Sequence, residues 1–214
     1  MTLNFSETAL IIIDVQNDFC PGGALAIERG DTIVKVINSL SSLFASRSAM
    51  VAASQDWHPK GHASFASTHG RQAGTSMDLP NVKDQTLWPD HCVQGSEGAD
   101  FHMDLDLNPV NLIIRKGFRM DLDSYSVFFE NDRKTATGLD AFLKTHSINT
   151  VLLGGLATDY CVLYSALDAV SLGYKTIIAE DAVMGVNFPI GSVEAAIKKL
   201  KDAGVIFINS EQIK

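Results

Sequence analysis

Short apolar runs rich in Ile, Val and Leu alternate with amphipathic segments along most of this chain, and this alternation limits the possible folds most strongly. Such runs are typical of strands that are covered on both faces of a parallel sheet. We predict six strands, at residues 9–15, 49–54, 110–115, 150–155, 175–179 and 205–208.

The segments between these runs have helical patterns. In residues 31–47 the apolar positions recur at i, i+4, i+7 and i+11, which is one helix face. Residues 193–200 repeat that spacing, and we expect Ser192 to cap this helix and Gly204 to end it. Residues 160–172 are apolar nearly all round, which predicts a buried helix.

Strands that alternate with helices predict an α/β fold: a three-layer, doubly wound, six-stranded and mainly parallel sheet with helices on both faces. We expect residues 1–214 to form a single domain. A long insertion without regular structure is predicted at about residues 57–108, and it holds five of the six histidines. Insertions of that length are usually functional. Ligands of such folds bind beyond the carboxyl ends of the strands.

The charge balance narrows the choice of partner. The chain has 17 Lys and Arg against 25 Asp and Glu, a net charge of −8. Nucleic acids and anionic membranes require a basic surface, so a small-molecule substrate is expected instead. The sequence leaves open whether the chain forms a homo-oligomer.

The N-terminal sequence and the cysteines indicate a compartment. The apolar run at residues 9–13 is too short for the core of a signal peptide, and no run is long enough to span a bilayer. Three distant cysteines do not suggest a disulfide framework. We therefore expect a soluble cytoplasmic protein with reduced thiols.

Two charged residues lie at strand ends. Asp14 follows four apolar residues, which suits either a general base with an environment-tuned pKa or a carboxylate that fastens its own loop. Lys116 directly follows a predicted strand and precedes a glycine. It is either an exposed surface lysine or, if strands 9–15 and 110–115 are neighbours, a partner of Asp14.

Histidines and a carboxylate cluster after the second predicted strand. Asp56 and His58 are two residues apart, so their side chains leave an extended segment on the same side. A turn could bring His62 back toward them, and His91 could close the site from another loop. Such ligands without a thiolate suit a catalytic metal, whereas exposed loop histidines are the simpler alternative.

The fourth predicted strand runs into a glycine-rich turn and a helix at residues 154–162. Thr158 or Asp159 could cap that helix, with Cys161 in its first turn. Free N–H groups there would stabilise a thiolate and could hold an oxyanion. Buried cysteines are usually inert, but this position favours a nucleophile.

Six motifs in order, spread nearly end to end, resemble the nicotinamidase/pyrazinamidase branch of the isochorismatase-like cysteine hydrolases. They are IDVQNDF at 13–19, DWHP at 56–59, WPDHCV at 88–93, RKG at 115–117, DSYS at 123–126 and GLATDYCV at 155–162.

The resemblance implies roles for particular residues. It implies a catalytic triad of Asp14, Lys116 and Cys161, and an oxyanion hole formed by the N–H groups of Ala157 and Cys161, with a cis peptide before Ala157. It also implies a divalent metal, with zinc ahead of iron or manganese, held by Asp56, His58, His91 and, in some members, the match of His62. Phe19, Trp88 and Tyr125 match aromatic residues that line the ring pocket.

The resemblance further implies hydrolysis of nicotinamide to nicotinate and ammonia through a thioester, in NAD salvage, with pyrazinamide as a second substrate. Two alternatives remain. One is another amidohydrolase of the same fold that acts on N-carbamoyl or ureido compounds. The other is a non-enzymatic metal or thiol sensor, which the lack of a second cysteine near Cys161 disfavours.

Overall fold

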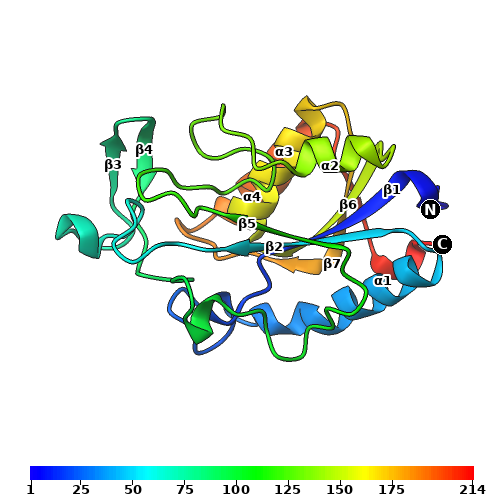
Figure 1. The fold of residues 1–214 in the computed structure, drawn as a ribbon, viewed down its shortest axis with the longest axis horizontal. Coiled ribbons are helices and arrows are strands. Elements are labelled where there is room, and N and C mark those ends of the chain that lie inside the picture. The colour runs from blue at the N-terminus through cyan, green and yellow to red at the C-terminus, as the bar shows by residue number, and fades with distance from the viewer.

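The computed structural model describes residues 1–214 and contains one six-stranded sheet (Figure 1). Its strands run in the spatial order β5-β2-β1-β6-β7-β8, and every neighbouring pair is parallel. Their bounds are β1 Thr8–Ile13, β2 Met50–Asp56, β5 Leu112–Lys116, β6 Thr150–Leu156, β7 Lys175–Met184 and β8 Ile206–Ile208. All six predicted strands are therefore confirmed, with shifted ends.

Helices cover both faces of this sheet, which confirms the predicted three layers (Figure 1). The helix α1 lies on one face, and α2, α3 and α4 lie on the other. Their bounds are α1 Val34–Ser46, α2 Leu139–Thr145, α3 Leu163–Ser171 and α4 Ser192–Asp202. No helix combines the length and the apolarity that crossing a bilayer would require.

The alternation of side chains along β1 builds the two cores. Leu10 and Ile12 pack on the α1 side with residues such as Phe44, whereas Ile11 and Ile13 pack on the α3 side. All six β1 residues are buried, as expected for a central strand covered twice. The close pairing with β6 needs Gly155, since a Cβ there would lie 2.0 Å from the Ile13 carbonyl oxygen.

The expectation that the insertion lacks regular structure is wrong. It contains an antiparallel hairpin, β3 Ser76–Leu79 and β4 Val82–Thr86, besides short 3-10 turns. The only apolar residues of the two hairpin strands are Met77, Leu79 and Val82, which is too short a pattern to predict two strands from the sequence. The short α2 was also missed.

The predicted cap of α4 needs correction. Gly191 occupies the N-cap position, and Ser192 is the first residue of the helix. The Ser192 hydroxyl donates to Asp159 instead, 2.5 Å away. The predicted end is confirmed, because α4 stops at Asp202 and Gly204 follows with φ of 85°.

Candidate active site

The functional candidates converge at the carboxyl ends of four strands. Asp14 directly follows β1, Asp56 ends β2, Lys116 ends β5, and Cys161 lies in the turn after β6. The strand β1 lies between β2 and β6. The chain first adds β2 and β5 on one side of β1 and then β6, β7 and β8 on the other side. Open α/β sheets bind their ligands at this kind of switch point.

Lys116 and Asp14 meet, although the condition considered for their contact, that their strands are neighbours, is not met. Their strands are not neighbours, because β2 lies between β1 and β5. The long lysine side chain nevertheless reaches past the end of β2, and its Nζ lies 2.8 Å from Asp14 Oδ2. Asp14 Oδ1 accepts a second contact, a hydrogen bond of 2.7 Å from Ser54. Both charged side chains are fully buried.

Lys116 Nζ is the centre of this charged group. It lies 2.5 Å from Asp56 Oδ1 and donates to the Ser124 carbonyl at 2.9 Å and to Cys161 Sγ at 3.4 Å. Burial alone would lower the pKa of Lys116, but Asp14 and Asp56 outweigh it and hold that pKa well above its usual range. We call Asp14, Asp56, Lys116 and Cys161 the charged floor of the site.

The nucleophile candidate lies on an unusual turn. Residues Thr158–Val162 form a π-helical turn that leads into α3, and Ala157 precedes it. The peptide bond between Leu156 and Ala157 is cis, as the family resemblance implied. The expectation that Thr158 or Asp159 caps the helix is wrong, because no side chain caps this turn.

Asp159 has a different set of contacts. Its carboxylate accepts hydrogen bonds from the backbone N–H groups of Val186 and Asn187, at 3.0 and 2.9 Å, besides the hydroxyl of Ser192. It therefore connects the turn that carries Cys161 to the segment that follows β7.

The Cys161 thiol is less acidic than the turn position suggested. Burial raises its pKa well above the usual range, Lys116 opposes this, and Asp14 adds to it. Burial also raises the pKa of Asp14, against the effect of Lys116. A neighbouring base must therefore accept the thiol proton before the sulfur can attack. Sγ lies within 4.8 Å of Asp14's carboxylate.

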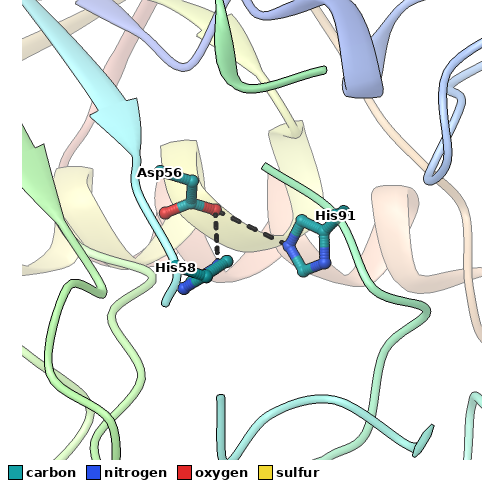
Figure 2. A group of neighbouring side chains, drawn as sticks. All are labelled: Asp56, His58 and His91. Atoms are coloured by element: carbon teal, nitrogen blue, oxygen red, sulfur yellow. Dashed lines mark ion pairs between the residues drawn. The ribbon is translucent and has the colours of Figure 1, made fainter. Parts of the chain in front are cut away.

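Asp56, His58 and His91 form a group that fits a metal ion (Figure 2). Asp56 Oδ2 lies 3.6 Å from His58 Nε2 and 3.9 Å from His91 Nε2. His58 Nδ1 donates to the Gly117 carbonyl and His91 Nδ1 donates to the Pro89 carbonyl, both at 2.8 Å. The Nε2 atom of each ring therefore keeps a free lone pair.

Two further observations agree with a metal at this group. His58 Nε2 is buried and has no hydrogen-bond partner, which would be costly without a ligand. Burial lowers the pKa of His91 to about 4, so its ring is neutral and able to coordinate. Gly117 has to be glycine, since a Cβ there would lie 2.5 Å from His58 Cε1.

His62 is not brought into this group. Its ring stacks on His58 with centroids 4.4 Å apart, on the side where Asp123 lies. Its Nδ1 is 2.8 Å from Ser64 Oγ, and its Nε2 is 3.2 Å from the Leu122 carbonyl. Both ring nitrogens therefore have partners within the protein, and a ligand role for His62 stays a prediction.

A largely apolar pocket opens above the charged floor. The predicted residues Phe19, Trp88, Tyr125 and Ala157 all line it. Sequence reasoning missed part of the lining, which consists of Leu25, Ile27, Asp123, Tyr160 and Val186. Of these, Asp123 and Tyr160 carried a signal, because they lie in the motifs at 123–126 and 155–162. The Tyr160 ring packs edge-on against Trp88, with centroids 4.8 Å apart.

Comparisons with known proteins agree on one group of relatives. A family model described as the isochorismatase domain matches residues 8–212. The chain is 46% identical over 196 residues to the nicotinamidase of Escherichia coli (strain K12), an alignment that covers 92% of each chain.

Solved structures give the same picture. PnC1 from L. infantum in complex with nicotinate aligns with a TM-score of 0.86 and 36% identity, covering 100% of this chain and 98% of that one. Pyrazinamidase of Pyrococcus horikoshii in complex with zinc aligns with a TM-score of 0.78 and 33% identity, over 95% of this chain and 99% of that one.

Proposed function

The chain belongs to the isochorismatase family, and on that premise we propose that it is a nicotinamidase, which hydrolyses nicotinamide to nicotinate and ammonia. This activity belongs to NAD salvage, and pyrazinamide is a second substrate. One observation carries most weight: Lys116 Nζ lies within 3.4 Å of both Asp14 Oδ2 and Cys161 Sγ, beneath an aromatic pocket. The relative in complex with nicotinate supports a ligand of this class.

In the proposed mechanism Asp14 takes the proton of the Cys161 thiol, while Lys116 keeps the carboxyl group and the thiolate in register. The thiolate attacks the carboxamide carbon, and the N–H groups of Ala157 and Cys161 stabilise the oxyanion. The protonated Asp14 then gives its proton to the departing ammonia, which leaves a thioester. Water hydrolyses this thioester to nicotinate and restores the thiol.

We also propose that Asp56, His58 and His91 hold one divalent metal ion, and that this ion is zinc, with iron or manganese as alternatives. The zinc complex of the P. horikoshii relative supports this choice. When bound, such an ion supplies Lewis-acid chemistry at the pocket floor. The three cysteines are free, which agrees with a reducing compartment such as the cytoplasm.

Ammonia release tests the proposal directly. The purified protein should release ammonia from nicotinamide and pyrazinamide but not from N-carbamoyl compounds. Cys161→Ala should abolish this release, while metal analysis finds an unchanged metal content. Near-normal release by Cys161→Ala would refute the mechanism, and activity on N-carbamoyl compounds alone would refute the function.

A second experiment tests the metal. Stripping the protein with a chelator should lower ammonia release, and adding back zinc, iron or manganese separately should show which ion restores it. If the stripped protein keeps full activity, the proposed metal has no part in the reaction.

A further inference from the structure

The hairpin formed by β3 and β4 has only one buried strand residue, Gln85. The other strand residues are exposed or half-buried, whereas Gln85 is 2% exposed. A hairpin normally attaches to the rest of a protein by an apolar face. This hairpin instead inserts a single amide, and a buried amide is costly unless its donors and acceptors are satisfied.

The Gln85 amide is fully engaged by its surroundings. Its Nε2 donates to Asp123 Oδ2 and to the Thr86 carbonyl, both at 2.9 Å, and lies 3.2 Å from the Tyr125 hydroxyl. Its Oε1 accepts from Asn131 Nδ2 at 3.0 Å. An amide has two N–H donors and one carbonyl oxygen, so these four contacts exhaust the donors and also use the oxygen.

Two of these partners line the substrate pocket, namely Asp123 and Tyr125. The Tyr125 hydroxyl also accepts a hydrogen bond of 3.0 Å from the indole of Trp88, which lines the pocket too. Asn131 holds the Tyr125 backbone N–H through its Oδ1 at 2.9 Å. Gln85 therefore lies behind the pocket and contacts the groups that set the position of the Tyr125 side chain.

We propose that Gln85 is a positioning residue for substrate recognition, acting through Tyr125 and Asp123 on the shape of the ring pocket. This inference rests on the proposed function. We call Gln85, Trp88 and Tyr125 the polar wall of the pocket. Gln85 has no hydrogen bond to any residue of the charged floor, so its loss should weaken binding of the substrate more than the chemical step.

The first test is Gln85→Met, which keeps the size of the side chain but removes its hydrogen bonds. KM for nicotinamide should rise about tenfold, with kcat changed by less than about threefold. Gln85→Glu keeps an acceptor for Asn131 but places a carboxylate beside Asp123, so KM should rise at least as much. Circular dichroism should show that each variant is folded.

The matched control is Ser76→Ala in the same hairpin. Ser76 donates to Asp84 Oδ1 across the two strands at an exposed position, so its loss loosens the hairpin without contacting the pocket. KM and kcat should both stay at the wild-type values. An equal rise of KM in Ser76→Ala would mean that any loosening of the hairpin suffices, and the role of Gln85 would be refuted.

A double-mutant cycle with Tyr125→Phe separates positioning from general stability. If Gln85 acts through the Tyr125 hydroxyl, Gln85→Met should raise KM clearly less in the Tyr125→Phe background. Fully additive effects, or an unchanged KM in both Gln85 variants of an active enzyme, would overturn the inference. If the wild-type protein releases no ammonia, the proposed function fails instead. The Kd for nicotinate, measured by calorimetry on the same variants, then tests Gln85 independently.

Discussion

The charged floor and the polar wall of the pocket hold their side chains in different ways. The floor combines two buried carboxylates with a buried ammonium and a thiol at the ends of parallel strands. The wall consists of neutral groups from loops and a hairpin, joined by directional hydrogen bonds. Removing one buried charge leaves its partners uncompensated, whereas removing one neutral donor costs little more than a hydrogen bond.

The largest effect is expected for Lys116→Met, which removes the ammonium between Asp14 and Asp56. We expect kcat to fall at least about 1000-fold and the free energy of unfolding to fall by about 3–5 kcal/mol. Ammonia assays and urea unfolding measure the two quantities. Lys116→Arg keeps the charge and should retain most of the stability. If the Lys116→Met protein were stable and active, the charged floor would not be more sensitive to substitution than the polar wall, and the comparison would be contradicted.

His91→Ala should have the next largest effect. It deletes one of the three residues of the proposed metal group, so metal affinity should fall by more than the roughly 10–100-fold typical of losing a partner outside the ligand shell. Elemental analysis of dialysed protein measures this. The control is His69→Ala in the same insertion, because His69 binds only the Ala63 carbonyl. Equal metal contents in both variants would contradict the assignment.

The smallest effect is expected for Trp88→Phe, a change within the polar wall. It keeps an aromatic ring but removes the N–H that donates to Tyr125, so KM for nicotinamide should rise about fivefold without a matching loss of kcat. Trp57→Phe is the control, because Trp57 stacks on Arg115 and does not line the pocket. A large fall of kcat in Trp88→Phe would show that the polar wall, like the charged floor, affects the chemical step.

The sheet and the floor could be predicted from the sequence because both depend on local signals. Each strand is an apolar run, and Asp14, Asp56 and Lys116 lie where such runs end. In a parallel sheet the carboxyl ends of the strands lie at the same edge, whatever the conformation of the loops. This logic reaches residues such as Lys116 even though its strand β5 is not a neighbour of β1. Position and spacing made these residues candidates, the resemblance joined them into a triad and a metal site, and both roles stay predictions.

The wall could not be predicted in the same way. Gln85 lies in a mostly polar segment whose sequence is typical of a solvated loop. It is buried only by contacts that form in the tertiary structure. Leu25 and Val186 reach the pocket from distant loops without any shared periodicity. Burial of the thiol, which depends on the whole fold and not on the turn alone, raises the pKa of Cys161, and no local sequence pattern indicates this.

The contacts of Asp159 have a consequence for protein engineering. Its carboxylate fastens Val186 and Asn187, and Val186 lines the pocket, so the mouth of the pocket and the turn carrying the sulfur form one unit made of two distant stretches of chain. A loop from a relative, placed at residues 185–192, would have to present its backbone N–H groups to the Asp159 carboxylate in the same positions as the original loop. The smallest unit that can be exchanged between relatives therefore consists of two separate stretches of sequence. In a chimera, position 159 and this loop should come from the same parent protein.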